Sequence, residues 1–396
     1  MKRIGLIVIT ALLFFWLSAC GGSSSNSSSN TNPATGGSSP AAGAQNPGTG
    51  SGGTSSGGSS TSALAYVAGS NQSFFGIRVD SSSNISTVSG SPYSLSGNLF
   101  GLAATGNLLF ASSVSSDFST ASITSYSADA NGALTQVATT PVGSSGGARI
   151  ALDSTGKFLY GTAQASNNGG TIPAIFGFSV DQNSGKLTSL AGSPWRITQA
   201  SDASSASNPA VTANGAWLCL NMSLARTNEA AQCYARHADG TIEPNNFVQS
   251  AVSNTGITGL ALTSDSTHLL YSEGASNQVF SSQISSAGNG SPVSSQGTLP
   301  AGIAVDPSGH WVAVVNHNSN NVAIFSVGAG DMLAAAGTAG TAANPAQVAF
   351  SHSGNYLFVT TTGGTVVYQF NSTTGAVTPL NASNPAAGVD GAIATM

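Results

Sequence analysis

Short apolar runs alternate with clusters of Gly, Asn, Asp and Pro from Ala63 to the end of the chain. The clusters recur about every 8–12 residues, a spacing typical of strands joined by tight turns. Runs such as 322–327 and 366–370 also alternate apolar and polar positions, as a strand with one buried face does. The pattern therefore predicts an all-β fold built from many short strands.

One sequence unit recurs along this part of the chain. Its clearest copies are residues 151–160, 304–313 and 349–358, each with an apolar run, a D-x-x-G type turn and a second apolar run. Equivalent positions fall at 66, 110, 160, 219, 271, 313 and 358. Seven copies of about 48 residues each match the length of a four-stranded propeller blade. We therefore predict a seven-bladed β-propeller over residues 63–396, with four antiparallel strands per blade.

The two ends of this region complement each other. The first copy lacks its opening strand, whereas residues 387–394 resemble an opening strand with nothing after it. We expect the carboxyl terminus to supply the missing strand of the first blade. This pairing would close the ring and remove an exposed sheet edge.

The first 62 residues have a different texture. Lys2 and Arg3 precede the apolar run 4–16, which is too short to span a bilayer. The run ends in Leu17-Ser18-Ala19-Cys20, which resembles the bacterial lipobox. We expect residues 1–20 to form a lipoprotein signal peptide that ends at the lipidated Cys20; the alternative is an ordinary signal peptide with an accidental cysteine. Residues 21–62 hold only small or uncharged polar residues and Pro, and we expect a disordered tether.

Composition narrows the range of partners. The chain has 9 Lys and Arg against 14 Asp and Glu, and charged residues make up 6% of it. No window forms the positive patch that nucleic acid requires, so we expect no nucleic-acid partner. The expected partner is a membrane, reached through the lipid on Cys20. This places the protein in the cell envelope, at the outer membrane, facing the periplasm or the exterior. A closed ring has no free edge, so we expect a monomer.

Two further cysteines lie inside the propeller region. Cys219 falls in the second strand of the fourth unit and Cys233 in its third strand, so a hairpin would place them opposite one another. A compartment outside the cytoplasm permits a disulfide. We predict a Cys219–Cys233 bridge, with two buried free thiols as the alternative.

Several motifs together resemble a known family. They are the unit 178–195 with its Gly192-Ser193-Pro194-Trp195 ending, the turn 306–309 and the segment 66–71. These look like the lactonase-type seven-bladed β-propellers, which include 6-phosphogluconolactonase-like proteins and YVTN surface repeats. The resemblance covers residues 63–396. It implies the propeller fold, and its members include lactone hydrolases, a lactonising enzyme and surface proteins without known activity.

The candidate site follows from topology. Connections between blades and the loops between second and third strands share the face that usually binds ligands, and there we expect Arg149, Glu273 and His317. The same face collects further polar residues: Asn71, Asp117, Arg226, Glu229, Asn318 and Asn344. Lactone hydrolysis needs a base that activates water and a cation that holds the developing oxyanion. Glu273 or His317 would be the base and Arg149 the cation; the alternative is that all three are ordinary rim residues.

Other features argue against catalysis or leave it open. The resemblance supports Glu273, which follows a Y-x-x-type strand exit, but family enzymes carry P-H-x-H-like stretches where this chain has Gly147-Ala148-Arg149. We expect no cofactor, and no metal either, because Asp117, Glu229 and Glu273 form no dense acidic loop. The primary hypothesis is a lipid-anchored binding or scaffold propeller that takes an unknown small molecule or protein at its mouth. The alternative is a lactonase-like hydrolase that opens a small non-phosphorylated lactone.

Overall fold

The computed structural model describes residues 61–69, 72–142, 149–167, 170–197, 203–224, 228–253, 255–286, 288–380 and 391–396. The expected signal peptide, Cys20 and nearly all of the expected tether lie outside these residues. Within them, no helix is long and apolar enough to cross a membrane.

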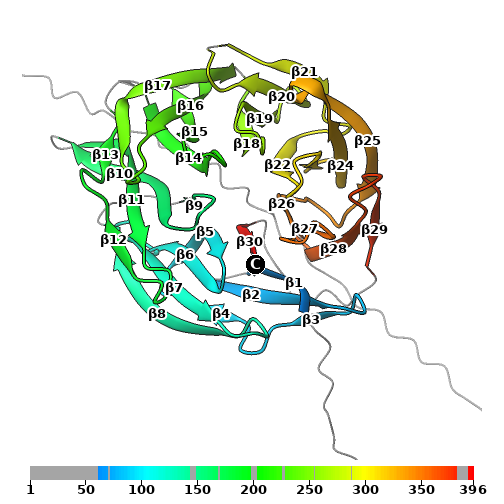
Figure 1. Ribbon diagram of the computed structural model, residues 1–396, viewed down its shortest axis with the longest axis horizontal. Helices are drawn as coiled ribbons and strands as arrows, with labels where there is room; N and C mark the ends of the chain where they lie inside the picture. The colour runs from blue at the N-terminus through cyan, green and yellow to red at the C-terminus, as the bar shows by residue number, and fades with distance from the viewer. Residues whose placement is uncertain are drawn as a thin grey trace, which may run out of the picture. The chain divides into compact units, whose positions relative to one another are not determined.

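Seven antiparallel sheets are arranged as a ring around a central axis (Figure 1). The first two blades contain β1 (Thr61–Ala68), β2 (Ser73–Asp80), β3 (Ile85–Thr87) and β4 (Tyr93–Ser94), then β5 (Asn98–Thr105), β6 (Leu108–Val114), β7 (Ala121–Ala128) and β8 (Leu134–Pro141). The third and fourth contain β9 (Ile150–Leu152), β10 (Phe158–Asn167), β11 (Gly170–Val180), β12 (Leu187–Ser189) and β13 (Trp195–Arg196), then β14 (Ala203–Val211), β15 (Trp217–Leu224), β16 (Asn228–Arg236) and β17 (Ile242–Ser253).

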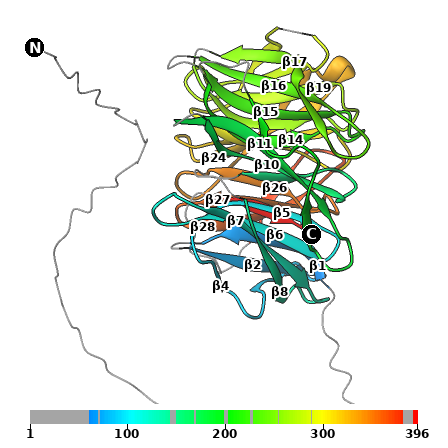
Figure 2. The ribbon, with the colours of Figure 1, turned by 90° about the vertical axis from the view of Figure 1, so that its left-hand side faces the viewer.

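The remaining blades repeat the same order, and Figure 2 shows the blades from the side. They contain β18 (Ile257–Leu262), β19 (His268–Glu273), β20 (Gln278–Gln283) and β21 (Ser291–Ser294); β22 (Pro300–Val305), β23 (Trp311–Asn316), β24 (Asn321–Val327) and β25 (Leu333–Gly340), with the 3-10 turn η1 (Ala329–Asp331); and β26 (Gln347–Phe350), β27 (Tyr356–Thr361), β28 (Gly364–Phe370) and β29 (Val377–Pro379). The predicted all-β, seven-bladed architecture is confirmed.

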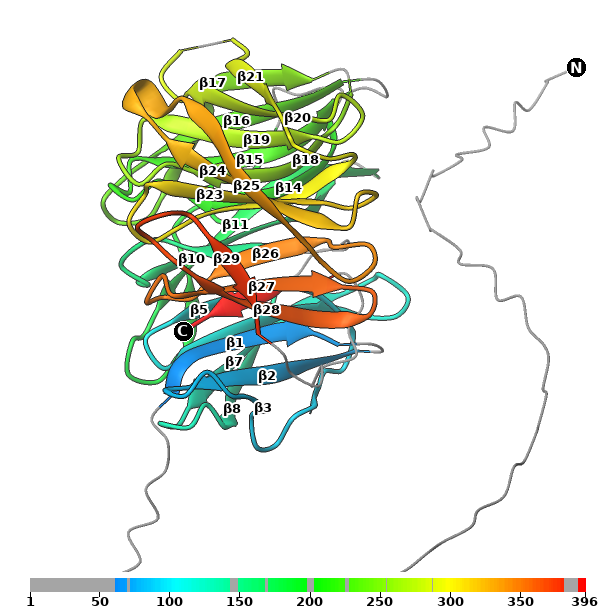
Figure 3. The same ribbon diagram turned by 90° about the vertical axis from the view of Figure 1, so that its right-hand side faces the viewer.

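The carboxyl-terminal strand β30 (Ile393–Thr395) completes the first blade. It pairs antiparallel with β1 through Ala65↔Thr395, Tyr66↔Ala394 and Val67↔Ile393. A backbone hydrogen bond at each end extends the pairing, from Ala68 N to the Ala392 carbonyl and from Met396 N to the Leu64 carbonyl. Figures 1 and 3 show β30 beside β1. The predicted closure is confirmed, although the described strand begins at Ile393, and residues 387–390 of the predicted strand lie outside the described residues.

The apolar core lies between the blades. Seven clusters of buried apolar side chains each combine residues from two neighbouring blades. One of them joins Ala65 and Ile77 of the first blade to Phe358 and Val367 of the last. Each blade therefore depends on both neighbours, because a single twisted sheet cannot bury both of its apolar faces alone.

The turns between first and second strands agree with the repeat. Asp306 is 3% exposed and accepts hydrogen bonds from Trp311 N and the Ser308 hydroxyl, and Gly309 closes the turn at φ 76°. In the third blade, Asp153 N donates to the Phe158 carbonyl, two residues before Tyr160. In the fifth blade, Thr263 N donates to the His268 carbonyl in the same way. The residue two positions after His268 is Leu270, which is therefore the equivalent of Tyr160. The repeat marker predicted at Tyr271 is therefore wrong by one residue.

Two structural details concern the third and fourth blades. The segment after β12 adds the short strand β13 beside β11. Cys219 and Cys233 pair directly across β15 and β16, and a disulfide joins them with a Cα–Cα distance of 3.9 Å. The predicted bridge is present.

A buried ion pair connects the third blade to the fourth. Arg236 Nη2 lies 3.3 Å from Asp153 Oδ2, and both side chains are at most 5% exposed. The same guanidinium donates to the Tyr160 hydroxyl at 2.5 Å and to the Gly215 carbonyl at 2.9 Å. It also lies over the Phe158 ring, 4.8 Å from its centroid. A buried pair of this kind is costly to break from one side, because the remaining charge has no partner.

Deleting residues 391–396 should cause aggregation or a large loss of thermal stability. The deletion exposes the inner edge of β1 and opens the interface between the first and last blades. Differential scanning fluorimetry and light scattering measure the effect. The control Ile393→Ala keeps the backbone pairing and should cost about 1–2 kcal/mol, because that side chain is only half-buried. Unchanged melting of the shortened chain would contradict the closure.

Arg236→Met should lower the free energy of unfolding by about 3–5 kcal/mol, because Asp153 then stays buried without its cation. Urea denaturation provides the measurement. Arg196→Gln, at an exposed arginine, is the matched control and should change stability by less than about 0.5 kcal/mol. The double variant Arg236→Met/Asp153→Asn should recover part of the loss; no recovery would show that the ion pair is not the cause.

Candidate functional site

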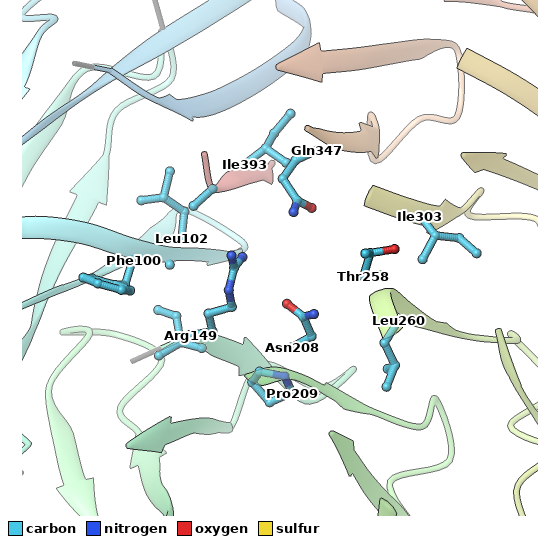
Figure 4. A pocket seen from close by; sticks show the side chains of 14 residues that line it. Phe100, Leu102, Arg149, Asn208, Pro209, Thr258, Leu260, Ile303, Gln347 and Ile393 are labelled. Carbon is cyan, nitrogen blue, oxygen red and sulfur yellow. The ribbon is translucent and has the colours of Figure 1, made fainter. Parts of the chain in front are cut away.

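A pocket of about 150 Å³ lies on the propeller axis, where the innermost strands converge (Figure 4). Every blade contributes to its lining. The lining residues are Phe100, Gly101, Leu102, Arg149, Ile150, Asn208, Pro209, Thr258, Gly259, Leu260, Ile303, Gln347, Ala392 and Ile393. Among these residues, none is Asp, Glu or His.

One column of the repeat explains the polar part of this lining. In the second to seventh blades, this position lies four residues before the first residue of the turn between the first and second strands, as Arg149 lies before Asp153. In the first blade it is Ala392, two residues before Ala394, which pairs with Tyr66. In blade order its residues are Ala392, Gly101, Arg149, Asn208, Gly259, Gly302 and Gln347. A small residue is required where blades approach closely: a Cβ at Gly259 would clash with the Ala301 carbonyl oxygen of the next blade. The three long polar residues therefore stand out against four small ones.

Arg149 lies immediately before β9 and extends its guanidinium into the pocket (Figure 4). Among the described residues, no carboxylate pairs with it and no acceptor bonds it, in contrast to Arg236. Burial lowers the pKa of the Arg149 guanidinium from its usual value, because the surrounding protein removes water from the charge. The group nevertheless stays protonated at neutral pH. Among the residues that the structure describes, nothing compensates the positive charge that Arg149 brings to the pocket.

Asn208 and Gln347 present carboxamides to the same space, from β14 and β26 (Figure 4). Neither side chain has a hydrogen-bond partner among the described residues. Asn208 adopts φ 49° at an irregularity in the pairing of β14 with β15. Thr258 also reaches the pocket, but its hydroxyl already donates to the Pro300 carbonyl at 2.6 Å. The two amides are thus available to a ligand as donors and acceptors.

Glu273 lies at the end of β19 and does not line the pocket. It is 7% exposed, and its Oε2 accepts hydrogen bonds from the Thr255 hydroxyl at 2.8 Å and the Ser276 hydroxyl at 2.9 Å. Both donors belong to loops at the end of the fifth blade. In this arrangement the carboxylate organises the loops around it.

His317 follows β23 and also lies outside the pocket lining. Its backbone N donates to the Leu299 carbonyl at 2.9 Å. Its Nδ1 lies 3.2 Å from the Pro345 carbonyl oxygen, a contact in which Nδ1 carries the proton and donates it. The ring thereby links the sixth blade to the connection that precedes β26. Of the three residues predicted to act together, only Arg149 reaches the central pocket.

The other predicted acids also have hydrogen-bond partners, Asp117 within its own loop and Glu229 on the strands β15 and β18. Asp117 Oδ1 accepts from the Ser115 and Ser119 hydroxyls, and these bonds lower the pKa of Asp117 to about 2. Glu229 Oε2 accepts from Ile257 N at 2.6 Å and Asn221 Nδ2 at 3.1 Å. Within the described part of the chain, no group of three His, Cys, Asp or Glu residues could hold a metal ion. Asn71 and Arg226 lie outside the described residues.

A second, larger depression of about 490 Å³ lies beside the fifth and sixth blades. Ser, Gly and apolar side chains form most of its wall, and Met332 is 57% exposed. Its one lining histidine, His268, is 2.7 Å from Asp331 and 2.8 Å from the Thr267 hydroxyl. Because that histidine already has partners, the central pocket offers the freer polar groups.

Sequence reasoning identified Arg149 but missed Asn208 and Gln347. The information was present in the repeat alignment, since both occupy the column of Arg149. What the sequence did not reveal was that this column points toward the axis. The arrangement can hold a ligand by hydrogen bonds and charge, and the described lining offers no side chain that ordinarily acts as a general base.

Comparisons with known proteins agree with the fold. A structure of a Lactobacillus plantarum protein matches with a TM-score of 0.65 and 14% identity, covering 84% of this chain and 99% of that one. The periplasmic gluconolactonase of Pseudomonas aeruginosa gives 0.63 and 15%, covering 84% and 98%. A candidate 6-phosphogluconolactonase of Bacteroides fragilis gives 0.62 and 16%, covering 85% and 98%. The chain matches none of the curated proteins.

The family comparison goes further than these distant structures. The model described as "Lactonase, 7-bladed beta-propeller" matches residues 89–198, 229–335 and 282–390, which together exceed half of the chain. The expected resemblance is thereby confirmed at the level of the family. The chain belongs to the seven-bladed β-propeller lactonase family.

Proposed function

We propose that this protein binds a small polar molecule in its central pocket and releases it unchanged. The observation that carries the proposal is the composition of the pocket: one unpaired guanidinium and two unpaired carboxamides, with no acid or histidine among the described lining residues. Convergent polar groups in a concave site are the usual basis of ligand recognition. They supply binding without the proton acceptor that hydrolysis requires.

Hydrolysis of a lactone places stricter demands on a site. A general base must lie within hydrogen-bond reach of the attacking water, directly or through one water molecule. Glu273 accepts hydrogen bonds from Thr255 and Ser276, and His317 lies against the Pro345 carbonyl, so both side chains already connect neighbouring segments. These contacts favour binding as the function of the central pocket.

Lactone hydrolysis is the second candidate, and family membership favours it. One solved relative of the same fold is a periplasmic gluconolactonase. In that case Arg149 would stabilise the oxyanion that forms when water attacks the lactone carbonyl. Glu273 or His317 would have to leave its present partners to take the proton from water. The substrate would be a small lactone without phosphate, because the described lining residues include one cation, Arg149.

We also propose that the protein acts outside the cytoplasm and is held at a membrane through a lipid on Cys20. The disulfide supports the compartment, because such bridges persist in oxidising environments. The apolar run and the Leu17-Ser18-Ala19-Cys20 sequence support the anchor. The segment 21–62 would then separate the propeller from the membrane surface.

Filling the pocket should abolish binding without altering the fold. Ala392→Leu adds bulk to the lining of the pocket and removes no polar group, so the rise in melting temperature caused by bound sugar acids, polyols or lactones should disappear. Ala334→Leu, on the exposed part of β25, is the matched control and should bind as the wild type does. Thermal shift measurements with a panel of these compounds test the prediction. Ligand-induced stabilisation that survives Ala392→Leu would place binding elsewhere.

The same proteins should not accelerate the opening of D-glucono-1,5-lactone above its spontaneous rate. A pH-stat or a proton-indicator assay measures the acid released. Turnover that is lost in Ala392→Leu and in Glu273→Gln would replace the binding proposal with the hydrolase candidate. Equal background rates in all three proteins would support binding.

Cys20→Ala should release the protein from membranes. The expected result in a bacterial host is loss of radiolabelled palmitate and a shift of the protein from the detergent-soluble membrane fraction to the aqueous fraction. Cys219→Ala/Cys233→Ala is the control, because it removes cysteines without touching the proposed anchor. An unlipidated wild-type protein would reject the anchor.

A further inference from the structure

We infer that the ligand of the central pocket is a small polyhydroxy carboxylate with a single negative charge. This inference rests on the proposed binding function and specifies the class of ligand. It follows from the Arg149 column of the repeat, in which three blades place polar side chains at the axis and four place Gly or Ala. The charge, the hydrogen-bonding groups and the size of the pocket each restrict the ligand.

The charge of the ligand follows from Arg149. A buried cation normally has a counter-charge, as Arg236 has Asp153 at 3.3 Å. Arg149 has none among the described residues, and its guanidinium points into open space on the axis (Figure 4). No described residue supplies this counter-charge, so we expect the ligand to supply it. A carboxylate fits the planar donor face of a guanidinium through two parallel hydrogen bonds.

A single negative charge is favoured over two. Among the described residues that line the pocket, Arg149 is the only cation, and no helix begins there to contribute a dipole. A phosphate dianion in this space would keep about one uncompensated charge, which is costly away from water. A monocarboxylate would balance the one charge among the described lining residues.

The neutral part of the ligand is recognised by Asn208 and Gln347. Each carboxamide offers two donor hydrogens and one acceptor oxygen, and a hydroxyl group can both donate and accept. A ligand that bears several hydroxyls would satisfy both amides at once. A purely apolar acid would leave them without partners inside the pocket, which weakens binding.

The size of the pocket sets the length of the ligand. A water molecule needs at least about 10–15 Å³ of comparable volume, so about 150 Å³ corresponds to roughly ten water positions. A chain of about four to seven carbons with its hydroxyls displaces this number of waters. Larger ligands would have to project out of the pocket, past lining residues such as Phe100.

Isothermal titration calorimetry with three probes tests the inference. D-gluconate carries one carboxylate, sorbitol replaces that group with a neutral CH₂OH on the same carbon skeleton, and inorganic phosphate supplies a small anion without the polyol. Wild-type protein should bind gluconate at least about tenfold more tightly than either of the other two. Arg149→Gln should weaken gluconate binding about tenfold to a hundredfold, the usual effect of losing hydrogen bonds to a charged group.

Two further variants keep the test interpretable. Arg149→Lys keeps the charge but loses the paired donors, so it should restore part of the affinity that Arg149→Gln loses. Arg196→Gln removes an exposed arginine far along the chain and should bind gluconate as the wild type does. Melting curves of all variants establish that each is folded before titration.

Each alternative result overturns a defined statement. Sorbitol binding as tight as gluconate, or gluconate affinity unchanged by Arg149→Gln, would overturn the carboxylate while leaving a binding pocket that Ala392→Leu still blocks. Phosphate binding tighter than gluconate would overturn the single-charge argument. Failure of all three probes to bind would overturn the ligand class, and the proposed function would then depend on the wider panel of compounds.

Discussion

A ring of twisted sheets is held together only if its first and last blades are joined, and here the join depends on the three residues of β30. An open ring would leave the inner edge of β1 unpaired and would expose the cluster that contains Ala65, Ile77 and Phe358. Since each of the seven apolar clusters spans two blades, the loss of one interface weakens both of its neighbours. Closure therefore supports the whole core, and it places Ala392 and Ile393 in the wall of the central pocket.

Closure also imposes a geometric limit at the axis. Seven innermost strands converge there, and neighbouring backbones approach closely enough that Gly259 would clash with Ala301 if it carried a side chain. Most positions of the inner column must be small for this reason. A long polar side chain is tolerated only where it can extend into the axial space, so Arg149, Asn208 and Gln347 together define the chemistry of the pocket. The central pocket is thus a consequence of how the ring closes.

The scarcity of charge gives this pocket its character. Charged residues make up 6% of the chain, and Asp117, Glu229 and Glu273 each accept hydrogen bonds from nearby donors. Among the described residues, no acid therefore neutralises the charge of Arg149. Membership of the lactonase family fixes the fold but leaves the chemistry to these side chains, because one fold can support different activities. In this chain they favour recognition of an anion.

Much of the fold follows from local chemistry. Repeat length, turn residues such as Asp306 and Gly309, the opposed positions of Cys219 and Cys233 and the complementary ends of the chain were all predictable, because each depends on residues close in sequence or on a repeated pattern. The marker in the fifth blade was wrong by one residue, because Leu270 and Tyr271 are both fully buried and apolar patterning cannot separate them.

The candidate site was only partly predictable, for a different reason. The sequence by itself determined that Arg149 lies next to the start of an innermost strand and that Glu273 and His317 end or follow second strands. Only the tertiary structure decided that Arg149 shares the axis with Asn208 and Gln347, whereas hydroxyl and carbonyl groups of nearby loops engage Glu273 and His317. Residues more than fifty positions apart meet at the axis because the ring closes, and no local pattern encodes that distance.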